Sequence, residues 1–172
     1  HAAAQANLGM SLLLIGDYEQ GWKQYEWRWK KDDFIEAKRT FGRPKWDGRP
    51  LAGRTLLLHA EQGLGDSFQF MRYIRHVDKD GGRLIVEVQP ALMHLFRDMP
   101  EIDELTPRGT EPPPFDVHIS FMSLAMVLGT TVETIPAAAP YLRADTARVE
   151  LWRGRLSGVQ QKRVGLVWRG NH

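Results

Sequence analysis

The chain of 172 residues has no cysteine. Disulfides, thiolate zinc sites and cysteine nucleophiles are therefore excluded, and the reducing cytoplasm is the compartment we expect. No apolar run approaches the roughly 20 residues of a membrane-spanning helix. The start, HAAAQANLGM, also lacks the basic region and the cleavage pattern of a signal peptide. We therefore expect no membrane span.

Neither positive nor negative side chains are in large excess. The sequence has 23 Lys and Arg against 21 Asp and Glu, a formal charge of +2, so the pI near 9.0 overstates how basic the surface is. This balance predicts no nucleic-acid partner. His76, His94 and His118 show no helical i, i+4 pairing with acids or with one another, so we expect no metal site. With 42% hydrophobic and 26% charged residues, the chain should be globular.

The first 31 residues predict two helices. Residues 2–15 are rich in Ala and Leu, which favour helix, and Gly16-Asp17 breaks this pattern. From residue 18 to about 31, aromatic side chains recur at i, i+4, i+7 and i+11 and form one helical stripe. The four are Tyr18, Trp22, Tyr25 and Trp29. Two helices joined by a Gly-Asp turn predict an antiparallel hairpin.

Residues 32–53 contain several Gly and Pro and show no sustained period, so we expect a linker wrapped over a surface. Trp46 is expected to pin this linker to a core. From residue 39 onward the stretch is basic, with Asp47 as the nearby acid, and its cations up to residue 54 are Arg39, Arg43, Lys45, Arg49 and Arg54. Two interpretations stay open: a solvated basic loop, and a loop that contacts an anion.

Residues 54–145 alternate between strand and helix patterns. Residues 54–60 and 83–89 are typical of buried strands, and residues 66–82 of a helix between them that is capped by Asp66. This βαβ unit implies parallel strands. Further elements follow: a helix at 90–99, strands at 104–106 and 115–120, short helices at 123–129 and 132–136, a capped helix at 145–156 and a strand at 163–168. We expect an α/β fold with a doubly wound, Rossmann-like parallel sheet.

The stretch EQGLGD lies between the first strand and its helix, where open parallel sheets bind ligands. Gly63 and Gly65 permit positive φ and close approach of a ligand to the backbone. The spacing is not the dinucleotide fingerprint, and the Walker Gly-Lys-Ser/Thr is absent. Asp66 has two compatible interpretations, a helix N-cap and a general base that faces a cleft.

Two neighbours of this loop are ambiguous. His59 is more often a core or loop histidine at such a position than a functional group. Glu61 either caps backbone amides of the glycine loop or binds a ligand hydroxyl.

The first 30 residues resemble a tetratricopeptide repeat. The matching positions are Asn7-Leu8-Gly9, Leu12, Gly16-Asp17-Tyr18, Gly21 and Tyr25, with Gly21 where the family usually has Ala. Because a single repeat cannot bury its own face, the resemblance implies the last repeat of an array, which offers a surface to a protein partner.

The chain as a whole resembles bacterial proteins in which tetratricopeptide repeats precede a glycosyltransferase-like module, related to heptosyltransferases and to O-linked N-acetylglucosamine transferases. The matching stretches are Tyr25-Glu26-Trp27-Arg28-Trp29, Trp46-Asp47-Gly48, Leu51-Ala52-Gly53, Glu61-Gln62-Gly63-Leu64-Gly65-Asp66, Phe70-Met71-Arg72-Tyr73, Pro114-Phe115-Asp116, Ser123-Leu124, Ile135-Pro136, Pro140-Tyr141-Leu142 and Val164-Gly165-Leu166-Val167-Trp168.

This resemblance implies a glycosyltransferase of two Rossmann-like domains, the GT-B fold. The helix pair would occupy residues 1–31, the linker 32–53 and the acceptor-side domain 54–145. Residues 146–172 would supply a connecting helix and the first strand of a truncated donor-side domain, so the chain is expected to be an inactive fragment of a longer protein.

The same resemblance implies site residues. Leu64-Gly65-Asp66 matches the loop that carries the proposed base of heptosyltransferases, which implies Asp66 as the base of an inverting transfer. Ligand contacts are expected from Glu61, Gln62, Gly63, Gly65, Gly170 and Asn171. The expected ligands of the full-length protein are a nucleotide-sugar donor and a sugar acceptor, either glycan or protein, with no cofactor.

Two other functions compete with this one. The chain could be a non-catalytic tetratricopeptide scaffold that docks protein partners. A nucleotide-binding oxidoreductase is disfavoured by the failed fingerprint, although Glu87 ends the second strand about 20 residues further on, where a ribose ligand would be needed.

Overall fold

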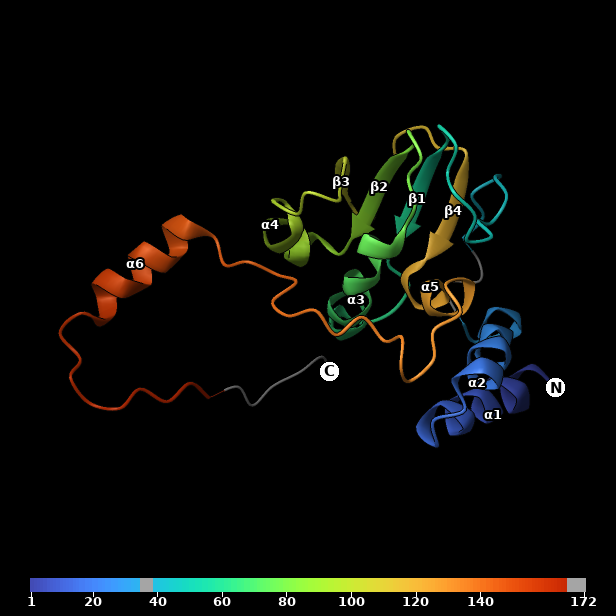
Figure 1. Cartoon of the computed structure of the whole chain (residues 1–172), viewed down its shortest axis with the longest axis horizontal. Helices are drawn as coiled ribbons and strands as arrows, with labels where there is room; N and C mark the ends of the chain where they lie inside the picture. The colour runs from blue at the N-terminus through green and yellow to red at the C-terminus, as the bar shows by residue number, and fades with distance from the viewer. Residues whose placement is uncertain (35–38, 167–172) are drawn as a thin grey trace.

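The computed structural model describes residues 1–34 and 39–166. Its centre is a four-stranded sheet in the order β3-β2-β1-β4 (Figure 1). The strands are β1 (Thr55–His59), β2 (Arg83–Val88), β3 (Glu104–Pro107) and β4 (Val117–Ser120). All three strand pairings are parallel. The prediction of an α/β fold with a parallel sheet is therefore confirmed.

The strand order creates a topological switch point between β1 and β4. From β1 the chain moves to β2 and β3, and it then returns to place β4 on the other side of β1. Leu56 of β1 pairs with Leu84 of β2 on one side and with Val117 of β4 on the other. In open α/β sheets, ligands bind beyond the carboxyl ends of the strands at such a point. The residues that follow His59 and Ser120 therefore form the first place to look for a site.

One face of the sheet carries the hydrophobic core. The elements packed there are α3 (Leu64–Met71), the 3₁₀ helices η3 (Arg72–His76) and η4 (Pro90–Leu92), α4 (Met93–Phe96) and α5 (Phe121–Val127). Leu56, Leu58 and Val86 project from the strands into this core, where Met71 and Leu124 meet them, and all five are fully buried. Burying side chains of this kind stabilises the fold by about 1.5–3 kcal/mol each.

The other face of the sheet is polar. Successive residues of a strand point to opposite faces, so Leu57 and His59 of β1 lie on this face, as do Glu87 of β2 and His118 of β4. All four are buried. A buried polar face needs both a cover and hydrogen-bond partners.

The segment from residue 39 to 46 supplies that cover. His118 N donates to Pro44 O at 3.1 Å, and Trp46 N donates to His118 O at 2.8 Å, so this segment pairs with the free edge of β4. Trp46 is 2% exposed and fastens the segment to the core. Arg39 donates two hydrogen bonds of 2.8 Å to the carboxylate of Glu87.

The chain begins with a helix pair, α1 (Ala2–Leu14) and α2 (Tyr18–Tyr25), and the 3₁₀ helix η1 (Glu26–Lys30) continues α2. The two helices touch through glycines. A Cβ on Gly9 would collide with the backbone of Tyr25, and a Cβ on Gly21 would lie 2.8 Å from the side chain of Leu13. The close contact therefore requires residues without a side chain at both positions.

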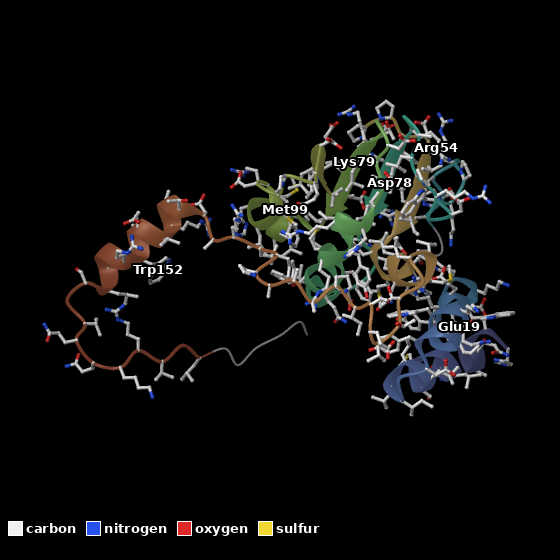
Figure 2. All side chains as sticks on the ribbon, in the orientation of Figure 1. Glu19, Arg54, Asp78, Lys79, Met99 and Trp152 are labelled. Carbon is white, nitrogen blue, oxygen red and sulfur yellow. The ribbon has the colours of Figure 1, made fainter. Side chains whose placement is uncertain are left out.

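The helix α6 (Thr146–Leu156) lies apart from the sheet at the end of an extended segment (Figure 1). Asp145 caps it and accepts a hydrogen bond of 2.7 Å from Arg148 N, as the sequence predicts. None of its residues is buried, and Figure 2 shows Trp152 on this helix, far from the sheet. The helix therefore contributes no buried side chain to the core.

Several expected elements differ in the structure, among them the following three. The helix expected at 66–82 begins at Leu64, ends at Met71 and continues as a 3₁₀ helix to His76. The helix expected at 132–136 is a turn. In the strand expected at 163–168, the described residues 163–166 form no strand, because no described strand lies beside them to supply hydrogen bonds.

We predict that Gly9→Ala lowers the free energy of unfolding by about 1–3 kcal/mol, because the added methyl forces α1 away from the backbone of α2. Urea unfolding measures the change. Gly154→Ala in α6 is the matched control, since nothing lies within 4 Å of a Cβ there. An equal effect of both substitutions would contradict the close contact.

Candidate functional site

A buried ion pair fills the crevice at the switch point. Glu61 follows β1, and Arg28 reaches it from η1. Arg28 Nη2 lies 2.9 Å from Glu61 Oε1, and Arg28 Nε lies 3.1 Å from Glu61 Oε2. The guanidinium therefore donates two hydrogen bonds to the carboxylate. The two side chains are 3% and 1% exposed. The pair therefore joins the helical segment to the sheet inside the protein.

Side chains from three further positions complete this network. Arg28 Nη2 donates to Ser123 Oγ at 2.9 Å, and Arg28 Nη1 donates to Glu26 Oε1 at 2.7 Å. Ser123 Oγ in turn donates to Glu26 Oε1 at 2.6 Å. Ser120, the last residue of β4, lies within hydrogen-bond distance of Ser123 Oγ at 3.0 Å. The network thus ties η1 to the carboxyl end of β4 and the start of α5.

The charges in this network oppose its burial. Burial raises the pKa of Glu61, while the charge and hydrogen bonds of Arg28 counteract that rise. Burial also acts to lower the pKa of Arg28, but the charges of Glu61 and Glu26 outweigh it and raise this pKa. Arg28 thus lies between two carboxyl groups, those of Glu61 and Glu26. Loss of Arg28 would leave two carboxylates without their cation.

Glu61 therefore has a structural partner that the sequence analysis missed. Both of its oxygens accept from Arg28, and Oε1 also accepts from Met122 N at 3.2 Å. No amide of the glycine loop among the described residues bonds this carboxylate, and the expected contact with a ligand hydroxyl stays a prediction. The signal in the sequence was the lone Arg28 inside the aromatic run YEWRW, since such a cation on a buried stripe needs a buried acid.

Asp66 occupies the first turn of α3, on the other side of this network. The N-cap is Gly63, so Asp66 is the third helical residue rather than the cap that the sequence predicts. Its Oδ2 accepts a hydrogen bond of 2.8 Å from Gly63 N. Among the described residues, this is the one hydrogen bond that the carboxylate makes. Asp66 thus closes the loop that precedes the helix and keeps Oδ1 for another partner.

Asp66 lines a cavity of about 360 Å³ between the helix pair and α3. The other lining side chains are Met10, Leu13, Tyr18, Trp22, Tyr25, Gln69, Phe70, Tyr73, Met122 and Ile135. Aromatic rings supply much of this wall, and Trp22 packs edge-on against Phe70 with ring centroids 5.9 Å apart. The buried Trp22 Nε1 has no hydrogen-bond partner in the described part of the chain.

The remaining expected site residues surround the loop. Gln62 Nε2 donates to Tyr25 Oη at 3.3 Å, which ties the loop to the helix pair. Gly63 has φ of −71° and Gly65 lies inside α3, so neither adopts the positive φ that glycine permits. Gly170 and Asn171 lie outside the described residues.

Glu87 is unavailable as the ribose ligand of an oxidoreductase, because both of its oxygens accept from Arg39. The described residues also contain no group of three or more acidic, His or Cys side chains placed to hold a metal ion.

Two histidines lie against each other on the polar face of the sheet. His59 Nε2 and His118 Nδ1 are 3.3 Å apart, and one ring must donate while the other accepts, so the contact needs at least one neutral imidazole. Burial lowers the pKa of His59 well below 6.5, and the charges of His118, Arg39 and Lys45 lower it further. Burial and the charge of Lys45 lower the pKa of His118 as well. Both rings are therefore neutral at pH 7.

The chain is similar to Protein FlbA of Caulobacter vibrioides, with 28% identity over 178 residues. The match covers 92% of this chain and 30% of FlbA, so the chain spans less than a third of the length of that relative. No protein family and no solved structure matches the sequence. Within the described residues, no helix has both the length and the apolar character needed to cross a membrane.

We predict that Arg28→Met destabilises the protein by about 3–5 kcal/mol, because it leaves the carboxylate of Glu61 buried without a cation. Urea unfolding at pH 7 measures the loss. Combining it with Glu61→Gln should cost less than the sum of the two single substitutions, since the second removes the unpaired charge. Additive losses would contradict the direct coupling of the two side chains.

We also predict that the protein loses stability as the pH falls from 7.5 to 5.5. The folded-state pKa values of His59 and His118 lie below the 6.5 of the unfolded chain. Their contribution is thus present above pH 6.5 and is lost as the pH falls below it, because the unfolded chain takes up protons that the folded chain does not. Urea unfolding across this range gives the slope, which His59→Gln should reduce and the exposed-site control His76→Gln should leave unchanged. An unchanged slope in His59→Gln would refute the assignment.

Proposed function

We propose that the chain forms the acceptor-binding part of a glycosyltransferase-like protein, in which Asp66 is the general base. One observation carries the proposal: Asp66, in the first turn of the helix that follows β1, lines a cavity with aromatic walls. Ligands of open α/β sheets bind in this region. The resemblance of EQGLGD and its neighbours to heptosyltransferase-like modules supports the same assignment.

The cavity has the chemistry that a sugar acceptor needs. Tyr18, Trp22 and Tyr25 offer flat apolar surfaces, with hydrogen-bonding groups at the ends of their rings, for the apolar face and the hydroxyls of a sugar. The unpartnered Trp22 Nε1 is a donor for an acceptor oxygen. The volume of the cavity, about 360 Å³, lies in the range of about 300–1,000 Å³ typical of small-ligand pockets.

In the proposed reaction, a hydroxyl oxygen of the acceptor attacks the anomeric carbon of a nucleotide-sugar. Asp66 takes the hydroxyl proton as the new carbon–oxygen bond forms. The bond from the anomeric carbon to the nucleoside diphosphate breaks, and the diphosphate leaves with the electron pair on the opposite face, so the configuration inverts. Gly63 N holds Oδ2 of Asp66, which orients the carboxylate and leaves Oδ1 to receive the proton.

The remainder of the whole protein would supply the donor site. The exposed Trp152 and Leu151 of α6, together with Val164 and Leu166, are apolar side chains that a second domain would bury. We further propose that α1 and α2 form a tetratricopeptide-type pair. The glycine contact at Gly9 and the exposed Leu8, Leu14 and Ile15, which a neighbouring repeat would cover, support this assignment.

A second candidate function is a non-catalytic scaffold. Arg28 and Glu61 fill the crevice at the switch point, where an enzyme of this architecture would often place its ligand. In a scaffold, this pair would serve to hold the helix pair rigidly against the sheet, and the helices would dock the partner.

The deciding experiment is Asp66→Asn in the whole protein. Asn keeps an oxygen that accepts from Gly63 N, so the loop should stay closed and the unfolding midpoint should remain near that of the unmodified protein. Sugar transfer from a nucleotide-sugar should fall by about 10²–10⁴-fold, because the base is gone.

Asp66→Ala serves as the matched comparison, because it removes both the base and the loop contact and should also lower stability by about 1 kcal/mol. Transfer by Asp66→Asn within a few fold of the unmodified rate would overturn the assignment of Asp66. Absence of any transfer by the unmodified protein with every nucleotide-sugar tested would favour the scaffold.

A further inference from the structure

A second cavity lies on the polar face of the sheet and has no part in the proposed sugar transfer. Its volume is about 350 Å³, again within the range of about 300–1,000 Å³ typical of ligand pockets. It opens between the sheet and the segment that covers it. The lining residues on which the inference rests are Trp29, Arg39, Phe41, Lys45, His59 and His118.

The charge around this cavity is positive. Lys45 Nζ lies 4.6 Å from the ring centroid of Trp29, and no carboxylate of a described residue lies within 4.0 Å of it in an ion pair. Arg39 stands beside it and is bonded to Glu87. Both cations contribute to the lowered pKa of His59, which places their charges close to the floor of the cavity. An anion would be attracted to this position.

Two buried polar atoms in the wall have no hydrogen-bond partner among residues 1–34 and 39–166. Trp29 Nε1 is a donor, and His59 Nδ1 is the nitrogen that the contact with His118 leaves unused. Buried polar atoms in proteins are paired in the great majority of cases. Phe41 packs over both imidazoles, with its ring centroid 4.6 Å from each, and Trp29 meets His59 edge-on with ring centroids 6.4 Å apart. A ligand that displaces the Phe41 ring would lie beside the imidazole of His59, with the indole of Trp29 next to it.

We propose that this cavity binds a small organic anion that carries hydroxyl groups, such as a sugar phosphate or a sugar acid. The anionic group lies against Lys45, and a hydroxyl reaches Trp29 Nε1 and His59 Nδ1 in place of the Phe41 ring. A hydroxyl suits these two atoms because it both accepts and donates. Inorganic phosphate would satisfy the cation but offers less to the imidazole, so it should bind less well.

This site is separate from the cavity of Asp66. The two cavities share no lining residue, and Ser120 and Ser123 of the Arg28–Glu61 network line the cavity of the two histidines. Binding here therefore does not depend on the proposed sugar transfer, and either assignment can fail without the other.

The first test is a titration of the whole protein with glucose 1-phosphate, glucuronate, glucose and inorganic phosphate. Side-chain ¹⁵N resonances of histidine report on His59 and His118. We expect saturable shifts of the His59 signals with glucose 1-phosphate or glucuronate, and at least tenfold weaker binding of glucose and of inorganic phosphate. No saturable shift up to about 10 mM of either organic anion, a concentration beyond weak millimolar affinity, would overturn the proposal.

The second test is Lys45→Met, which removes the charge and keeps an unbranched side chain against Trp29. It should weaken binding of the organic anion at least tenfold. Lys30→Met is the matched control, because Lys30 Nζ makes the same kind of contact with the Trp27 ring, 4.0 Å from its centroid, outside the cavity. Asp66→Asn should also leave this binding unchanged. Equal loss in Lys45→Met and Lys30→Met, or loss in Asp66→Asn, would refute the assigned position.

Discussion

The structure depends on the buried pair of Arg28 and Glu61. Removing two charged groups from water is costly, and the attraction between them repays that cost when geometry and further hydrogen bonds are favourable. Here the guanidinium contacts the carboxylate through two nitrogens, and the serines and Glu26 engage its remaining donors. Such a pair admits one arrangement of its partners. The helix pair is therefore fixed in one position on the sheet, which an apolar contact would define less sharply.

That fixed position divides the space around η1 into two cavities. Tyr18, Trp22 and Tyr25 line the cavity of Asp66, whereas Trp29 lines the cavity of the two histidines. The division follows from local geometry. After Tyr25 the α-helix tightens into a 3₁₀ helix with three residues per turn, so each later side chain is rotated further around the axis than an α-helix would place it. Trp29 therefore lies outside the stripe formed by Tyr18, Trp22 and Tyr25, and is directed towards the polar face of the sheet.

The sequence predicted the parallel sheet correctly but did not predict the contacts within the site. Continuous apolar runs such as LLL at 56–58 and LIV at 84–86 identify buried parallel strands, because both faces of such strands are covered. The start of α3 was placed two residues late, because Asp at a helix start fits the third position as well as the cap. The Arg28–Glu61 pair joins positions 33 residues apart and leaves no periodic trace. The strand expected at 163–168 has the right composition, but composition cannot provide a neighbouring strand.

Neither backbone strain nor packing explains the glycine at position 65, in the first turn of α3. It lies in a helical turn without positive φ, and nothing in the structure stands within 4 Å of the Cβ it lacks. Glycine inside a helix is less favourable than alanine by about 1 kcal/mol. Gly154 of α6 is equally unconstrained, so the position of Gly65 in the chain has to supply the argument. Because Gly65 directly precedes Asp66 and is exposed, it leaves bare backbone beside the carboxylate, where a ligand or a further domain can come close.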